Sequence, residues 1–192
     1  MTCGIGDKGL CFIYHADYIL VHFEKQMTDV EHAFTEPDDR ETKQQLRHKI
    51  TRLLARREHS YAELVQKLSN PVNRDDFPNE LILEVLQQFV DKDIQSDARF
   101  TYHFIRNGLA KGQGWQRIKQ AASPHNLDNS LLQATVEELD IDWFEHALAV
   151  KIKKFGEEVE QDFTKRQKQM RFLQYRGFSH DEIAFAVTAK PI

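Results

Sequence analysis

A six-residue pattern occurs three times in this chain at nearly equal intervals, and it constrains the fold more than any other feature. The copies begin at Phe77, Leu127 and Phe178, which lie 50 and 51 residues apart. Each copy has an apolar anchor, polar residues suited to a helix start, and an i, i+4 pair of apolar residues typical of a short amphipathic helix. The pattern predicts three related helical units in tandem, an arrangement typical of binding proteins.

A second amphipathic segment precedes each copy of the pattern, with Leu64, Ile118 and Leu173 at matching positions. The connecting loops shorten along the chain, since 13, 9 and 5 residues separate these positions from the anchors that follow. Glycine and proline are few, 8 and 5, which argues against β-rich architectures with many tight turns. We therefore predict an all-α fold of three tandem three-helix repeats, with nine core helices.

The helical signal divides the chain into four parts. Residues 1–40 form a variable N-terminal extension that is acidic toward its end, and the repeats are predicted at residues 41–95, 96–141 and 142–192. Ser60 and Ser179 are each followed three residues later by a glutamate, which predicts capping boxes at two helix starts. Glycines predict a helix break at residues 108–114 and a helix end at Gly177.

The composition favours a cytoplasmic protein. The net charge of −4 provides no basic field for tight, nonspecific binding of nucleic acid. Cys3 and Cys11 are the only cysteines, too few for a disulfide framework, which fits a reducing compartment. The apolar stretch Leu10–Phe23 is interrupted by polar residues and is too short to span a bilayer.

Several short motifs together carry a resemblance to a known family. They are Leu54–Ser60 followed by Glu63-Leu64, Asp97–Phe100, Lys111–Gly114 followed by Arg117-Ile118, and Phe172–Ser179. In this order and spacing, the motifs resemble the RecX family of bacterial regulators of the RecA recombinase, over about residues 46–189. Residues 1–40 have no counterpart in the family pattern, and the loop Ser69–Asp76 lacks the glycine expected there.

The resemblance implies an elongated, curved molecule that binds in the groove of the RecA filament on single-stranded DNA. Such a protein limits filament growth or promotes disassembly, and so suppresses the ATPase, coprotease and strand-exchange activities of RecA. It needs no cofactor of its own, and we expect it to be a monomer.

Basic residues in all three repeats are the candidate contacts to RecA or DNA. They are Arg52, Arg56, Arg57, Lys111, Arg117, Lys119, Lys165, Arg166, Lys168, Arg171 and Arg176. A solvated helix face explains the same residues without any partner. The resemblance favours the contact interpretation for the group, though not for any one residue.

Among the aromatic residues, Trp115 is the candidate for stacking on nucleic-acid bases because it follows a polar glycine turn. Phe104, Trp143, Phe144 and Phe172 fall at positions that match apolar helix faces, so we expect them in the core.

No arrangement of residues predicts catalysis or a metal site. Residues 111–115 lack the Gly-Lys-Ser/Thr of a P-loop, which favours a turn between helices. The short cysteine spacing of a zinc site is absent from the set Cys3, Cys11, His15 and His22. The acidic residues between 137 and 142 are better explained as a link between two helices, and His59-Ser60 as a helix cap.

Two functions therefore stay open. The first is a non-enzymatic regulator that binds the RecA filament in its groove. The alternative is a DNA-binding module that competes directly for single-stranded DNA without contacting a recombinase. Salt separates the two, because binding to bare DNA through phosphates weakens steeply as salt rises.

Overall fold

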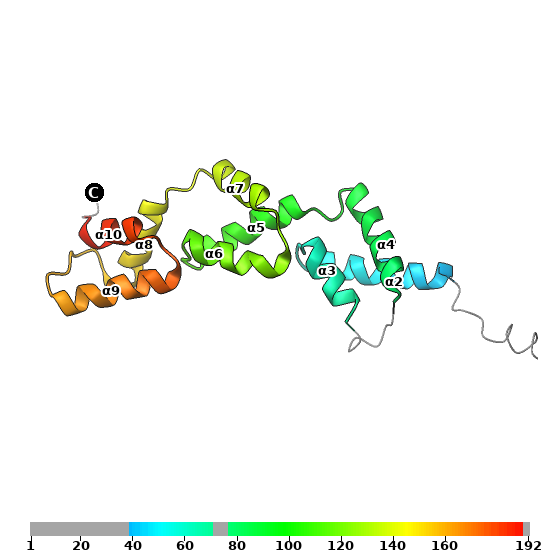
Figure 1. The fold of residues 1–192 in the computed structure, drawn as a ribbon, viewed down its shortest axis with the longest axis horizontal. Coiled ribbons are helices and arrows are strands. Elements are labelled where there is room, and N and C mark those ends of the chain that lie inside the picture. The colour runs from blue at the N-terminus through cyan, green and yellow to red at the C-terminus, as the bar shows by residue number, and fades with distance from the viewer. Residues whose placement is uncertain (1–38, 71–76, 190–192) are drawn as a thin grey trace, which may run out of the picture. The chain divides into compact units, whose positions relative to one another are not determined.

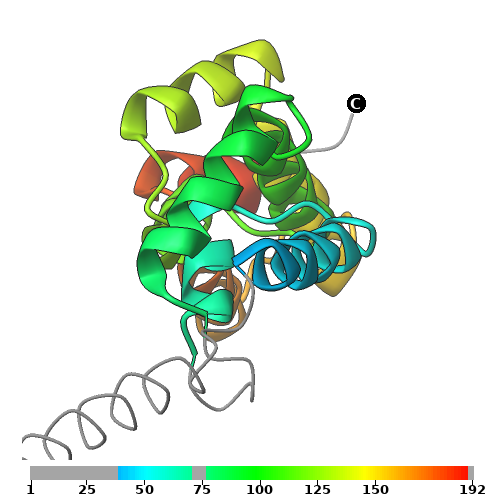
Figure 2. The same cartoon turned by 90° about the vertical axis from the view of Figure 1, so that its right-hand side faces the viewer.

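The structure, a computed structural model, describes residues 39–70 and 77–189. This part of the chain contains nine α-helices and one short 3-10 helix, and no strand (Figures 1 and 2). The residues from Gln45 onward form one unit, and the other unit, Met1–Gln44, is described only from Asp39. The all-α prediction is confirmed.

The helices follow one another in three triplets. The first triplet comprises α2 (Asp39–Leu54), α3 (Tyr61–Leu68) and α4 (Asn79–Asp91). The second comprises α5 (Asp97–Ala110), α6 (Trp115–Ala122) and α7 (Asn129–Glu138), with the 3-10 helix η2 (Ser123–His125) after α6. The third comprises α8 (Trp143–Phe155), α9 (Phe163–Arg176) and α10 (His180–Thr188). We call these triplets the first, second and third repeat; the residue limits given above for the repeats stay a prediction.

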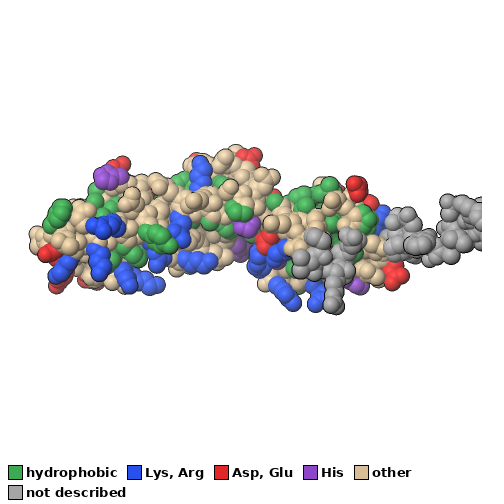
Figure 3. Space-filling view, turned by 60° about the horizontal axis from the view of Figure 1, so that its bottom comes forward, with side chains coloured by type: hydrophobic (Ala, Val, Ile, Leu, Met, Phe, Trp, Pro, Cys, Tyr) green, Lys and Arg blue, Asp and Glu red, His purple; other side chains and the backbone are tan. Residues whose placement is uncertain are grey.

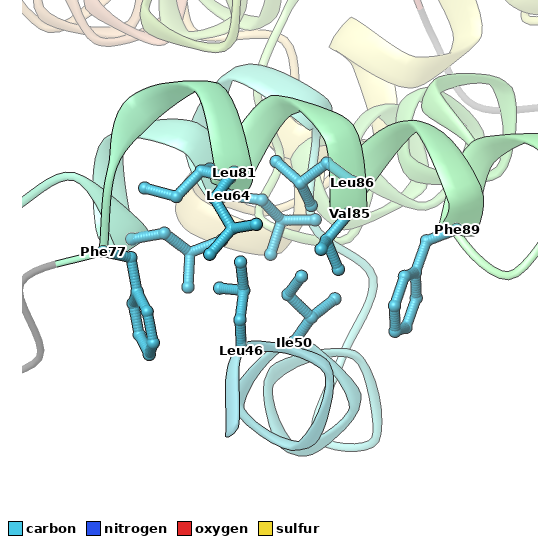
Figure 4. Packing of buried hydrophobic residues seen from close by; sticks show 10 residues of the cluster. Leu46, Ile50, Leu64, Phe77, Leu81, Val85, Leu86 and Phe89 are labelled. Carbon is cyan, nitrogen blue, oxygen red and sulfur yellow. The ribbon is translucent and has the colours of Figure 1, made fainter. Parts of the chain in front are cut away.

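Each repeat has a hydrophobic cluster of its own. In the first, Leu46 and Ile50 on α2 point at Val85 and its neighbours on α4, with Leu64 of α3 between them (Figure 4). Separate clusters surround Ile118 in the second repeat and Leu173 in the third. Leu64, Ile118 and Leu173 are 0%, 1% and 0% exposed, so the matching apolar positions read from the sequence are core positions.

The two predicted capping boxes have different outcomes. At α10 the box is complete, because Ser179 Oγ accepts from Glu182 N–H while the Glu182 carboxylate accepts from Ser179 N–H at 2.8 Å. At α3 only the first half forms, in which Ser60 Oγ accepts from Glu63 N–H at 3.1 Å. The Glu63 carboxylate instead contacts Arg57 and Lys67, since two cations hold an anion more strongly than one backbone N–H.

Two other predictions need correction. Helix α5 continues through Gly108 to Ala110 instead of breaking there. A Cβ at Gly108 would lie 2.7 Å from Cγ1 of Ile118, so this glycine permits close helix packing. Phe144, expected in the core, is 45% exposed and pairs edge to face with Phe185 at a centroid distance of 5.6 Å. The turn at residues 111–114 and the left-handed cap at Gly177 (φ 87°) are as predicted.

Candidate interaction surface

Two helices of the described chain contain cations and no acidic residue. Helix α9 carries five cations, Lys165, Arg166, Lys168, Arg171 and Arg176. Helix α6 carries Arg117 and Lys119. Every other described α-helix contains at least one aspartate or glutamate. These are the middle helices of the second and third repeats, so positive charge is concentrated on them although the whole chain is weakly acidic.

Helices α6 and α9 also meet end to end. The backbone N–H groups of Gly114 and Gln116 donate to the carbonyls of Arg176 and Gly177 at 2.9 and 3.1 Å. Arg117 Nη1 donates to the carbonyl of Tyr175 at 2.9 Å. Carbonyls at a helix C-terminus and N–H groups at a helix N-terminus lack partners in their own helices and carry opposite partial charges. The junction satisfies both sets and joins the second repeat to the third.

Both glycines at this junction are required by the close approach of the two backbones. A Cβ at Gly114 would lie 2.5 Å from the carbonyl oxygen of Gly177, and a Cβ at Gly177 would overlap Arg117. Gly177 in addition has a φ of 87°, which side chains other than glycine adopt at a cost. The close approach therefore fixes how α6 and α9, the two helices that carry cations and no acidic residue, lie relative to one another.

Four of the eleven predicted contact residues hold the structure together. Arg57 pairs with Glu63. Arg166 donates from Nε to the carbonyl of Glu160 at 3.2 Å, and Arg176 donates to the carbonyl of Lys111. Together with Arg117, these guanidinium groups have partners within the structure.

The other seven predicted residues have exposed side chains that form no hydrogen bond or ion pair within residues 39–70 and 77–189. They are Arg52, Arg56, Lys111, Lys119, Lys165, Lys168 and Arg171. Figure 3 shows Lys and Arg side chains gathered along one face of the molecule. Cations without local partners are available to an acidic partner and steer its approach.

Two surface hollows are lined in part by these cations. One, of about 450 Å³, lies in the first repeat and is lined by Lys49, Arg52, Arg56 and Phe77 among others. The other, of about 390 Å³, lies between the second and third repeats. It is lined by the cations Lys111, Lys153, Lys154 and Arg176, by His146, and by apolar residues that include Phe172. Lys153 and Lys154 were not among the predicted contacts.

Glu63 lies near the junction between the first and second repeats, with its carboxylate 3.9 Å from Nδ1 of His125. Burial raises the pKa of Glu63, but hydrogen bonds from Arg57 and Lys67 outweigh it and hold the pKa below its usual value. His59 is 2% exposed; its Nδ1 donates to the carbonyl of Arg57 at 2.8 Å and its Nε2 lies 3.2 Å from Lys67 Nζ. Burial lowers the pKa of His59, and the charge of Arg57 acts in the same direction.

We expect stability to fall in mild acid because two histidines, one buried and one half-buried, have lowered pKa values. Burial also lowers the pKa of His146, so both His59 and His146 bind protons more weakly in the folded chain than at the ordinary value of 6.5. The unfolded chain therefore gains protons first as the pH falls below 6.5, and the free energy of unfolding decreases. The contribution of Glu63 has the same sign but is lost only at lower pH, below its ordinary 4.5.

The measurement is thermal unfolding between about pH 7.5 and about pH 5.5. A His59→Gln variant should lose less stability across this interval than the wild-type chain, because the group that titrates is absent. An equal loss in both proteins would contradict the assignment to His59.

The remaining candidate residues also have clear places. Asp142 caps α8 by accepting from the N–H groups of Phe144 and Glu145 at 2.9 and 3.0 Å, as expected for a link between helices. No group of three metal-ligating side chains occurs among the described residues, and Cys3, Cys11, His15 and His22 lie outside them. No helix in the described part of the chain is both long and apolar enough to cross a membrane.

Trp115, the residue predicted to stack on bases, is not fully exposed. It is half-buried and packs against the cluster of the second repeat, with its ring 6.0 Å from that of Trp143. The exposed aromatic residue of this region is Tyr175, which is 72% exposed. It was not among the residues predicted from the sequence. Its position at i+4 from Arg171 and i+7 from Lys168 was the available signal.

Comparison with known proteins identifies the family. Residues 140–187 match the family model described as "RecX, third three-helix domain". Over 135 residues the chain is 42% identical to Regulatory protein RecX of Acinetobacter baylyi. The alignment covers 70% of this chain and 81% of the relative. The chain belongs to the RecX family of regulatory proteins. Regulatory protein RecX of Halorhodospira halophila is 32% identical over 144 residues, or 75% of this chain and 87% of the relative.

Solved RecX structures share the fold. A crystal structure of RecX from Lactobacillus salivarius matches with a TM-score of 0.63 at 18% identity, over 77% of this chain and 95% of that one. A second RecX crystal structure matches with a TM-score of 0.62 at 16% identity, over 88% and 86% of the two chains. The RecX family consists of regulators and not of enzymes, in agreement with the sequence analysis.

Proposed function

We propose that this RecX-family protein binds the RecA filament on single-stranded DNA, within its groove, and limits filament growth. Lower ATPase, coprotease and strand-exchange activities of RecA follow from a shorter or less stable filament. The protein requires no cofactor of its own, since the nucleotide belongs to RecA. It acts as a monomer in this proposal.

The observation that carries the proposal is the set of seven exposed cations without local partners, which occur in all three repeats. A filament offers the same subunit surfaces and DNA phosphates again and again along its length. A chain whose repeats each contact the filament gains from high effective concentration, because the first contact brings the others into reach.

The same cations also support the second candidate function, direct competition for single-stranded DNA. This candidate requires that inhibition appears only as the DNA itself becomes covered. It also requires steep salt dependence of binding to bare DNA.

The test is the ATPase rate of the host's RecA on single-stranded DNA while this protein is added at physiological salt. We expect inhibition well below one copy per RecA subunit, because one copy that limits growth affects many subunits. Inhibition that begins only when the protein saturates the DNA would contradict the filament proposal and favour the competitor.

A further inference from the structure

Tyr175 lies at the junction of α6 and α9 with its ring held in place. The guanidinium of Arg117 lies over the ring, 4.8 Å from the centroid, and donates to the Tyr175 carbonyl at 2.9 Å. Two contacts to one residue fix Arg117, and Arg117 in turn restrains the ring. The Tyr175 residue is nevertheless 72% exposed. A flat aromatic surface is therefore presented to solvent in a defined orientation.

The same face of α9 carries cations at regular spacing. Lys168, Arg171 and Tyr175 occupy positions i, i+3 and i+7, which lie in a row on one side of an α-helix. Successive members of this row are about 4.5 and about 6 Å apart along the axis, given the rise of an α-helix. Neither α9 nor the adjoining α6 has a carboxylate to neutralise them.

From this arrangement we propose that Tyr175 and Arg117 form a base-stacking site for single-stranded nucleic acid, with Lys168 and Arg171 holding the phosphates that follow. This proposal rests on the proposed function, because the RecA filament contains a single strand of DNA that such a site could bind. It adds a direct contact to the nucleic acid and names the residues that make it.

Charge and ring chemistry together favour a nucleic acid over a protein surface. Proteins that hold single strands combine a cationic track with aromatic rings on which bases stack, and cationic arginine adds to the stacking. The row formed by Lys168, Arg171 and Tyr175 contains both the cations and the aromatic ring, and no acidic residue lies on its helix. The chain as a whole has a net charge of −4, so attraction to phosphates depends on such local rows.

The experiment measures binding of the full-length chain to labelled oligothymidylate by fluorescence anisotropy at physiological salt, without RecA. A strand of the same length with abasic sites is compared in parallel. The wild-type chain should prefer the base-bearing strand, and Tyr175→Ala should weaken binding to that strand about tenfold. The variant should bind the abasic strand as the wild type does. Tyr175→Phe should keep the preference, because the ring and not the hydroxyl stacks.

Tyr102→Ala is the matched control, since Arg106 lies 5.6 Å over the Tyr102 ring in the same kind of pair, but on the acid-containing α5. The Tyr102→Ala variant should bind the strand as the wild type does.

An equal loss for both strands in Tyr175→Ala, or no loss, would overturn the stacking site. So would a variant that loses inhibition of the RecA ATPase but binds the strand normally, because Tyr175 would then contact protein. Loss of strand binding with ATPase inhibition intact would retain the site and count against direct competition for DNA, because inhibition would then not depend on binding the strand.

Discussion

Replacing Gly114 by alanine should separate the third repeat from the second. The added methyl group would lie 2.5 Å from the carbonyl oxygen of Gly177, which is backbone and cannot rotate away. Relief of the overlap therefore requires that α6 and α9 move apart. That movement breaks the hydrogen bonds from the Gly114 and Gln116 N–H groups to Arg176 and Gly177. We expect a loss of about 2 to 3 kcal/mol in the free energy of unfolding, the upper range for overpacked sites.

The measurement is chemical denaturation combined with hydrogen exchange at the amide of Gln116, whose acceptor is the carbonyl of Gly177. Exchange at this amide should accelerate in the Gly114→Ala variant, while amides inside α4 stay protected. Gln116→Ala serves as the control, because it removes an exposed side chain and keeps the N–H group that makes the contact. An unchanged denaturation midpoint for Gly114→Ala would show that the junction tolerates the methyl group.

The helices were predictable because the signals that define them are local. An apolar residue at every third or fourth position places Leu64, Ile118 and Leu173 in the core whatever the neighbouring repeats do. Likewise, a serine followed three residues later by a glutamate predicted the cap of α10 from four consecutive residues.

The errors share a cause, which is contact between residues distant in sequence. Gly108 suggested a helix break, yet its lack of a side chain serves the packing of Ile118 from the next helix. Phe144 fits an apolar helical face, but its partner is Phe185, and the pair lies partly in solvent. Nothing in the local pattern around either residue contains this information.

The same reasoning applies to the candidate site. The sequence offered the basic residues as a group but could not divide them into those with structural partners and those without. Arg117 and Arg176 bond to backbone carbonyls 58 and 65 residues away, whereas Lys168 and Arg171 have no such partner in the described chain. Backbone carbonyls are present in every residue, so no sequence pattern reveals which of them accepts from an arginine. The placement of Arg117 over the Tyr175 ring is likewise visible only in the structure.

Reversing the charge of Lys168 and Arg171 should have the largest effect on function. Both side chains are exposed and have no partner in the described chain, so their replacement by glutamate removes attraction and adds repulsion without breaking a structural contact. We expect the double variant Lys168→Glu, Arg171→Glu to require roughly a hundredfold more protein for half-inhibition of the RecA ATPase. This corresponds to about 1 to 1.5 kcal/mol at each position. Lys168→Gln with Arg171→Gln should give an intermediate loss, because it removes attraction alone.

A matched control separates local from global charge. Lys92 and Arg106 are also exposed, and they lie on or next to helices that contain acidic residues. Lys92→Glu with Arg106→Glu changes the net charge by the same amount as reversal on α9. If inhibition depends on the α9 row, this control should retain nearly full activity under conditions where the α9 variant is inactive. Equal losses in the two variants would mean that association depends on the net charge of the protein and not on the position of the cations on α9.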